Sequence, residues 1–546
     1  MSKRRLSSLI IFSLIGVFFY LPILLILVQA FIGKTAWINL WQLLGSGVFR
    51  NTLIFSCSEA LLSAVFSLLI ALPGAYFFGR FDFPGKRLLR SWLAIPFMLP
   101  GILVVLGLII FYGKNGAFTL WLTGIFPGLA EINYLYSFWG IVLANVLYNF
   151  AFCLRLLGER WEKIDPRLSE ASALHGASAW ETWRRIVWPL LRPTAVYLLA
   201  MVFLYSFLSF TVVLILGGYL YKTFEVLIYI ETNSKLNFSG ATAIAGLQMI
   251  LLAALLFLQS LVSRNAPPAA RFQAALPRLR WRTHSGATLA FLAYLAVVTG
   301  FFMGPLLAVI ARSFYRANSS GLTLANYLSL WGDGFTFAIG KSFKEVLATS
   351  LGLALTAAVA TTGGAYGFAW LRRKEPWGLL DLACQLPLGV SFLTFATGLY
   401  RLAGTILPSA ALIVWAQVFL AFPLVYSVLR TARRELGQAV LDASALLGAD
   451  PWRTFVRVEL PLMRKALQTG FTYAFAIALG DFSAVLVLGR GDLVTLPVAI
   501  YRLIGHYHFP EATALGTLFI LLSLILYFGF QGRSASFASM PRKEST

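Results

Sequence analysis

Long runs of apolar residues, separated by short polar segments, extend along almost the whole chain. Most runs contain the 18 or more residues that a helix needs to cross about 30 Å of hydrocarbon. The runs lack the short alternating segments of outer-membrane strands, so the expected fold class is an all-α polytopic membrane protein. We predict about twelve transmembrane helices, with approximate limits 8–31, 51–79, 91–113, 138–156, 194–218, 240–263, 287–310, 343–371, 377–402, 407–429, 466–489 and 512–530.

The predicted spans fall into two groups of six on either side of a polar segment. That segment, 264–284, contains three prolines and five arginines and is expected to remain outside the bilayer as a cytoplasmic linker. The resulting domain prediction is a first lobe at 1–263, a second lobe at 285–532 and a cytoplasmic tail at 533–546. Proline interrupts the third span at Pro96 and Pro100 and the ninth at Pro387, so we expect kinked helices there.

The two groups of spans are related by an internal duplication. Ala443 lies 272 residues after Ala171 (443 minus 171), and the same spacing relates further identical or similar residues. These pairs are Glu170 and Asp442, Gly176 and Gly448, Trp180 and Trp452, Pro189 and Pro461, Phe210 and Phe482, and Tyr229 and Tyr501. An even number of spans in each copy places both lobes in the same orientation. The sequence therefore predicts two parallel homologous six-helix lobes.

Each copy contains a polar segment between its fourth and fifth spans, at 165–189 and 437–461. In the first copy, Asp165 and Pro166 are typical of a helix start, and Gly176 separates this helix from a second amphipathic one. The apolar faces are too small to form a core of their own. Such a pair of helices is suited to dock into a groove of another protein, although resting on lipid at the membrane surface is an alternative.

Composition and charge agree with a membrane protein and indicate its orientation. The chain of 546 residues is 59% hydrophobic and 12% charged, with a net charge of +22. Most Lys and Arg residues cluster on one side of the predicted spans, including Lys3 to Arg5 and the tail, which predicts an inner-membrane protein with both termini in the cytoplasm. Topology and contact with anionic membrane lipid explain this charge without nucleic acid. Cys57, Cys153 and Cys384 lie in predicted spans without disulfide or metal-ligand spacing.

Two acidic residues lie within predicted spans, where charge is costly and often functional. Asp481 is the stronger candidate for a group beside a translocation pathway, where it would favour a cationic substrate. Its counterpart in the first copy is Ser209, so the two lobes differ at this position. Glu59 is a weaker candidate of the same kind. A structural role, or a position nearer the membrane surface, is the alternative for each.

Catalytic and metal-binding motifs are not indicated. Gly33-Lys34-Thr35 and Gly340-Lys341-Ser342 end like a phosphate-binding loop, but each lacks the required preceding glycine, at Val28 and Phe335. The four histidines do not have zinc-protease spacing. We therefore predict no catalytic residue, no metal site and no cofactor.

The duplicated segments resemble the Glu-Ala-Ala loop of ATP-binding-cassette importer permeases. The residues that carry this resemblance are Glu170, Ala171, Gly176 and Pro189 in the first copy, and Asp442, Ala443, Gly448 and Pro461 in the second. Asp442 replaces the usual glutamate, and Ser172 and Ser444 replace the second alanine. The resemblance implies that both segments dock on a separate ATPase subunit, with a dimer of it expected. A periplasmic or lipid-anchored binding protein would deliver the substrate.

Permeases with both lobes in one chain are typical of the thiamine and ferric-iron importer families. The stretch Gly480-Asp481-Phe482-Ser483, followed by Thr495-Leu496-Pro497, is closer to the thiamine branch. The resemblance implies a non-hydrolytic permease that forms the translocation pathway for thiamine. A ferric-iron permease of the same family is the first alternative. An ion-coupled secondary transporter of twelve spans is the second, and the paired polar segments argue against it.

Overall fold

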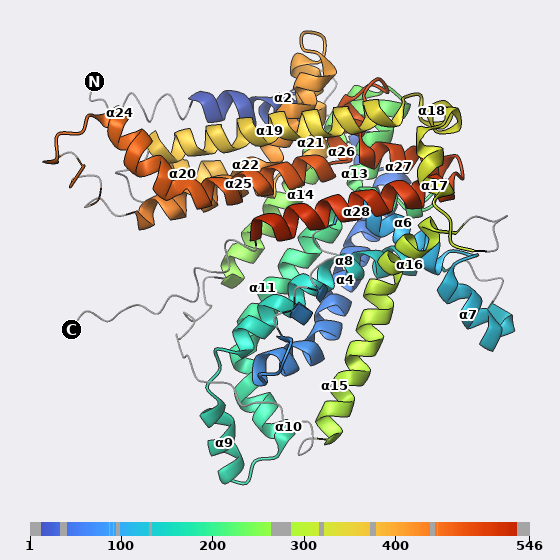
Figure 1. Cartoon of the computed structure of the whole chain (residues 1–546), viewed down its shortest axis with the longest axis vertical. Coiled ribbons are helices and arrows are strands. Elements are labelled where there is room, and N and C mark those ends of the chain that lie inside the picture. Colours follow the sequence, from blue (N-terminus) through green and yellow to red (C-terminus); the bar gives the residue numbers. More distant parts are fainter. Residues whose placement is uncertain are drawn as a thin grey trace. The chain divides into compact units, whose positions relative to one another are not determined.

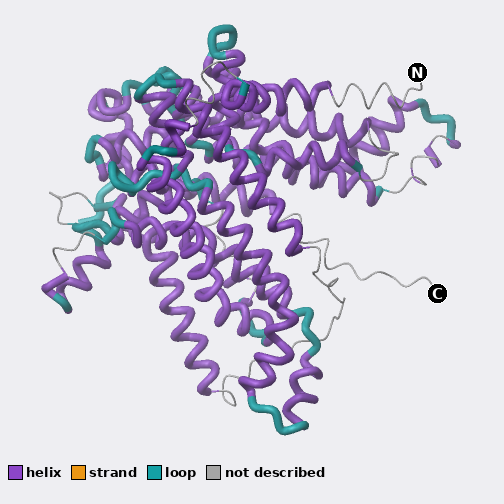
Figure 2. Tube along the Cα trace, turned by 180° about the vertical axis from the view of Figure 1, so that it is seen from behind, coloured by secondary structure: helices purple, strands orange, loops and turns teal. Residues whose placement is uncertain are grey.

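The described part of the chain is helical throughout. The computed structural model describes residues 13–32, 41–86, 88–90, 92–93, 99–129, 134–263, 285–315, 321–371, 378–436, 440, 443–444 and 446–531. Within these ranges there is no strand, and Figure 2 shows only helices and the loops that join them. The predicted linker 264–284, the predicted tail and Asp442 lie outside the described residues.

Ten helices in the described ranges are long and apolar enough to cross a membrane. They correspond to ten of the twelve predicted spans, and the all-α polytopic fold class is confirmed. The ten are Ser13–Phe31, Gly47–Arg80, Gly101–Ile125, Phe138–Trp161, Ala179–Phe207, Phe238–Phe257, Thr288–Ser313, Phe343–Trp370, Ser409–Glu435 and Phe509–Leu526.

The other two predicted spans, 377–402 and 466–489, are interrupted helices. The first divides into α20 (Leu379–Gln385), the short helix η7 (Leu386–Gly389), which contains Pro387, and α21 (Phe392–Ala403). The second divides into α25 (Leu460–Gly480) and α26 (Ser483–Leu488). Proline removes a backbone donor in the first case. In the second, the extended backbone of Asp481, with ψ of 119°, ends α25.

The chain forms two compact units. One comprises 40–230 and 247–323, and the other comprises 1–39, 231–246 and 324–546. In the first unit, α4 (Gly47–Arg80), α8 (Phe138–Trp161) and α11 (Trp188–Phe207) pack together. In the second, α19 (Phe343–Leu371), α22 (Ser409–Glu435) and α25 pack in the same combination, and Figure 1 shows these three running alongside one another.

Each compact unit also contains the first helix of the opposite sequence repeat. Helix α2 (Leu21–Phe31) packs on α21. Just before α2, the Phe18 carbonyl accepts a hydrogen bond from Trp415 Nε1 of α22 at 2.8 Å. In the other unit, α16 (Gly304–Ser313) packs on α6 (Gly101–Tyr112). The compact units are therefore not the same division of the chain as the lobes 1–263 and 285–532 that we predict from the repeat.

The first helices of the two repeats, α2 and α16, pack against their partners in the same way. Each helix follows a π-helical turn, η1 (Gly16–Tyr20) or η5 (Thr299–Met303), and carries proline near its start. The backbone at Pro22 lies so close to Gly398 that a Cβ there would collide with the carbonyl oxygen. Pro305 approaches Gly107 in the same way, at 3.0 Å from the position of a Cβ. The duplication therefore extends to the way in which each first helix is held.

Candidate functional site

The first polar segment folds into two short helices with well-defined ends. Helix α9 (Pro166–Leu174) begins at Asp165, whose side chain accepts a hydrogen bond from the Arg167 N–H at 2.9 Å. It ends at Gly176, which has φ of +80°. There, the Ala177 N–H donates to the Ser172 carbonyl at 3.1 Å. This is the Schellman pattern that favours glycine, because other residues are strained at positive φ.

After the glycine, the chain enters a helical run that continues into the membrane. Ser178 and Glu181 form a capping box at the start of α10 (Ala179–Thr182). The π-helical turn η3 (Trp183–Val187) follows, and α11 begins at Trp188. Pro189 lies in the first turn of α11, directly after the π-helical turn, where it removes one backbone donor from the continuous helical run. The polar segment is thus continuous with a membrane-spanning helix.

The second polar segment has the same construction where the structure describes it. Gly448 has φ of +77°, and the Ala449 N–H donates to the Ser444 carbonyl at 3.2 Å. Asp450 replaces Ser178 as the cap, and its carboxylate accepts from the Trp452 and Arg453 N–H groups at 2.8 Å each. Helix α24 (Pro451–Thr454), the π-helical turn η8 (Phe455–Glu459) and α25 follow in order.

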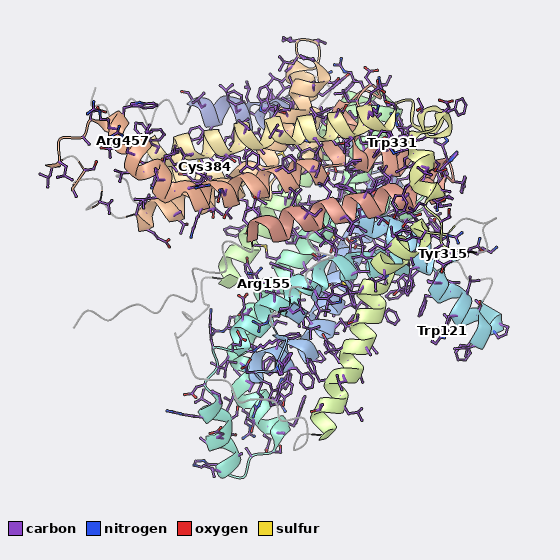
Figure 3. All side chains as sticks on the ribbon, in the orientation of Figure 1. Trp121, Arg155, Tyr315, Trp331, Cys384 and Arg457 are labelled. Carbon is purple, nitrogen blue, oxygen red and sulfur yellow. The ribbon has the colours of Figure 1, made fainter. Side chains whose placement is uncertain are left out.

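The predicted docking residues that are described lie at the surface of their units. Glu170, Ala171, Gly176 and Pro189 are exposed in the first segment, and Ala443, Gly448 and Pro461 are exposed in the second. Arg457, labelled in Figure 3, is an exposed cation on η8.

Large apolar side chains are exposed at matched positions of both segments. Leu174 and Leu446 are 87% and 89% exposed, and Trp180 and Trp452 are 65% and 70% exposed. Leu168 and Val440 form a third exposed pair. Exposed apolar side chains at matched positions of both segments agree with an interaction surface there.

The buried contacts at the end of each polar segment, where its π-helical turn meets the neighbouring helices, differ between the two units. In one, Arg433 on α22 forms an ion pair with Glu459 on η8 at 2.5 Å, and both side chains are 2% exposed. Tyr366 on α19 donates to the same carboxylate. The matched positions in the other unit are Trp161 and Val187, which are neutral and buried. The sequence reading missed this ion pair, although the 272-residue spacing exposes the contrast.

Asp481 lies buried between α25 and α26. Its Oδ1 accepts from the Ala484 N–H at 3.1 Å, and its Oδ2 accepts from Gln417 Nε2 at 3.3 Å. Gln417 also donates to the Ala478 carbonyl at 3.2 Å. The carboxylate therefore caps the start of α26 and is held by a side chain of α22.

Ser209 occupies the matched break in the other unit, between α11 and α12 (Thr211–Leu216). Its carbonyl accepts from Thr223 Oγ1 at 2.9 Å. The aromatic pair beside each break is also repeated. The ring centroids of Phe210 and Tyr229 lie 5.5 Å apart, and those of Phe482 and Tyr501 lie 5.2 Å apart. The two candidate pathway positions thus have the same aromatic pair beside them but different side chains.

Glu59 is completely buried among polar side chains of α4 and α8. Its Oε1 accepts from Asn145 Nδ2 at 2.6 Å and from Ser63 Oγ at 2.9 Å. Asn145 and Gln417 are matched by the repeat spacing, and each donates to a buried carboxylate. In one unit that carboxylate comes from α4, whereas in the other it comes from the break after α25. The sequence reading missed both carboxamides, which the same spacing would have identified.

The other motifs considered in the sequence are the phosphate-loop-like stretches and the histidines. Ser342 of the second phosphate-loop-like sequence forms a reciprocal cap with Glu345 at the start of α19. Gly33-Lys34-Thr35 lies outside the described residues. His508 Nδ1 lies 3.7 Å from Glu511. Within the described residues, no group of three or more His, Cys, Asp or Glu side chains could hold a metal ion.

Comparison with known proteins places these features in a family. A model described as the binding-protein-dependent transport system inner membrane component matches residues 63–265 and 300–536. The Thiamine transport system permease protein ThiP of Escherichia coli is 28% identical over 505 residues, 90% of each chain. The protein of the same name from Haemophilus influenzae is 26% identical over 487 residues, 88% of this chain and 87% of that one. The Putative ferric transport system permease protein FbpB 1 of Haemophilus influenzae is 25% identical over 473 residues, 84% of this chain and 71% of that one.

Proposed function

Because the chain belongs to the family of binding-protein-dependent transport system inner membrane components, we propose that its cargo in ATP-driven import is thiamine. The observation that carries this proposal is the similarity to thiamine permeases over 88–90% of the chain. The chain is a multi-pass inner-membrane permease subunit. Both termini are assigned to the cytoplasm on the distribution of Lys and Arg.

The two polar segments dock on the ATPase subunits in this proposal. Glu170, Ala171, Gly176 and Pro189 belong to the first dock, and Ala443, Gly448 and Pro461, with Asp442, belong to the second. Their support is the repeated pair of capped helices and the exposed apolar side chains at matched positions. Since each segment leads directly into a membrane helix, α11 or α25, movement of a docked ATPase would tilt that helix. The chain itself carries out no hydrolysis, and its ATPase partners supply that reaction.

Asp481 and Ser209 are proposed to lie beside the translocation pathway. Each lies at a break in a membrane helix, and irregular backbone at membrane depth is typical of segments that line a polar passage. Thiamine carries a permanent positive charge, and the Asp481 carboxylate would attract it. Because conduction requires release, this attraction is expected to be weak and the binding protein supplies the affinity.

Ferric iron is the second candidate cargo, since the ferric permease relative matches 84% of this chain. The match covers only 71% of the ferric permease, compared with 87% and 90% of the two thiamine permeases. This difference favours thiamine. Family membership argues against an ion-coupled secondary transporter.

Uptake of labelled thiamine and labelled ferric iron tests the cargo. Cells would express this chain together with its candidate ATPase and binding protein. We expect thiamine uptake that disappears when the ATPase carries an inactivating substitution. Iron uptake without thiamine uptake would move the assignment to the ferric branch, and uptake of neither would contradict the cargo proposal.

A further inference from the structure

A hydrogen bond between two hydroxyl groups occurs in both polar segments. Ser172 Oγ lies 3.0 Å from Thr182 Oγ1, and Ser444 Oγ lies 2.9 Å from Thr454 Oγ1. The serines and the threonines are each 272 residues apart (444 minus 172 and 454 minus 182). The same side-chain pair is therefore present twice, in two copies of a fold whose caps have diverged from Ser178 to Asp450.

Each pair joins the first short helix of its segment to the helical run that enters the membrane. Ser172 lies in the last turn of α9, and Thr182 is the last residue of α10, directly before the π-helical turn η3. Residues Ala179–Phe207 form one uninterrupted helical run that includes α11. A force on α9 therefore reaches the membrane helix through the glycine turn and through this pair.

The helix caps do not fix the angle between the two short helices. The Schellman bond from the Ala177 N–H to the Ser172 carbonyl ends α9, and the Ser178–Glu181 box starts α10. Each of these fixes one helix end. The Schellman bond encloses Gly176, and the capping box begins only at Ser178, so neither cap joins a residue of α9 to a residue of α10. The angle between the two helices therefore depends on side-chain contacts between them. Thr182 is only 9% exposed, and its hydroxyl is satisfied there by Ser172 rather than by bulk water.

We propose that Ser172 with Thr182, and Ser444 with Thr454, are positioning residues that fix the angle between the two docking helices and so transmit ATPase movement to α11 and α25. This inference rests on the proposed function. Both serines stand where the motif that the segments resemble has alanine, which has no hydroxyl to form this bond. The pairs act through the helices and do not touch the cargo.

The test measures thiamine uptake per ATP hydrolysed in proteoliposomes that contain this chain, its ATPase and its binding protein. The variants are Ser172→Ala, Thr182→Val and the double variant, with Ser444→Ala and Thr454→Val for the second pair. Loss of one ordinary hydrogen bond predicts uptake per ATP lower by about three- to tenfold in each single variant. The double variant is expected to lose no more than a single variant, because both remove the same bond.

Two controls separate positioning from general stability. Thr182→Ser keeps the hydroxyl and is expected to retain the ratio of uptake to hydrolysis. Copurification of the ATPase and the thermal midpoint of the complex are expected to stay unchanged in Ser172→Ala. Unchanged uptake per ATP in all single variants, additive losses in the double variant, or equal loss in Thr182→Ser would overturn the inference. If the unaltered complex takes up no thiamine, the proposed function fails, and the positioning role fails with it.

Discussion

At the scale of single residues, the buried carboxylate of Asp481 makes the most direct prediction about cargo. Asp481→Asn keeps the shape of the side chain and an oxygen for the Ala484 N–H, but removes the negative charge. If a cationic cargo passes this position, we expect thiamine uptake to fall by about tenfold, the effect of roughly 1.4 kcal/mol. Transport assays in cells with equal membrane levels of both proteins would measure it.

Asp333→Asn is the matched control for Asp481→Asn. Asp333 is an exposed carboxylate at the start of α18 (Asp333–Ile339), so the same charge is removed away from the helix break. Unchanged uptake in both variants would exclude Asp481 from the pathway and leave it as the cap of α26.

The glycines of the two docking segments make a second prediction at this scale. Gly176→Ala and Gly448→Ala place a side chain at φ of +80° and +77°, a strain of about 1–2 kcal/mol for an L-residue. We expect less ATPase to copurify with each variant, while membrane insertion is unaffected. Asn tolerates this backbone region better than Ala, so Gly176→Asn should retain more of the partner.

Gly124→Ala is the control for the two docking glycines. Gly124 lies in α7 (Ala117–Ile125), and a Cβ there meets nothing within 4 Å. Equal copurification of the ATPase with Gly176→Ala, Gly448→Ala and Gly124→Ala would remove the turn from the docking assignment.

Residue-level prediction from the sequence worked for helix breaks, because glycine and proline inside a helical pattern are conspicuous. Gly176 and Pro387 interrupt helices as expected, whereas the pathway role of Asp481 stays a prediction. Thr182 is a common residue in a polar segment, and only its distance to Ser172 reveals the pair. Nothing local in the sequence shows that Glu459 is buried beside Arg433.

At the scale of helices, the two polar segments are held by different buried contacts, so substitutions at matched positions should change stability differently. The Arg433–Glu459 pair joins α22 to η8. Glu459→Gln would remove the Glu459 carboxylate from the buried Arg433 guanidinium, and breaking a buried ion pair typically costs about 3–5 kcal/mol. We expect a clearly lower thermal midpoint for the purified protein, measured in detergent by tryptophan fluorescence.

The other unit supplies the matched control for this pair. Arg433→Trp combined with Glu459→Val introduces the residues found at the equivalent positions, Trp161 and Val187. This double variant removes both charges together and should be more stable than Glu459→Gln alone. A thermal midpoint for Glu459→Gln equal to that of the unaltered protein would show that the pair contributes little.

Helix-level prediction found the apolar spans but not the breaks within them, at Ser209 in 194–218 and at Asp481 in 466–489. Ten predicted spans correspond to long apolar helices, because length and hydropathy alone identify a membrane helix. In 466–489, hydropathy continues through Asp481, although the helix ends there. The break depends on a carboxylate that caps α26 and on Gln417 from a distant part of the chain, and no local pattern encodes that contact.

At the scale of the whole molecule, the orientation in the membrane follows from charge and can be tested directly. Most Lys and Arg lie in segments assigned to the cytoplasm. A reporter that is active only in the cytoplasm should therefore be active when fused after residue 546 and after residue 284, and inactive after residue 320. Activity after residue 320 would contradict the predicted topology.

The duplication was evident from the sequence, whereas the packing of the first helices was not. Identical spacing of many residue pairs indicates a repeat without any knowledge of contacts. In contrast, the apolar faces of α2 and α16 carry no information about which helix they contact. Their partners are determined by the close approach of Pro22 to Gly398 and of Pro305 to Gly107, which exchanges the first helices between the compact units.

The energy source of transport is the most direct test of the account. Proteoliposomes would contain this chain alone or with its ATPase, with binding protein and labelled thiamine outside. ATP would be inside, or a proton or sodium gradient would be imposed without ATP. The account predicts thiamine accumulation only with the ATPase and ATP together. Accumulation by the chain alone, driven by an ion gradient, would contradict it and indicate a secondary transporter.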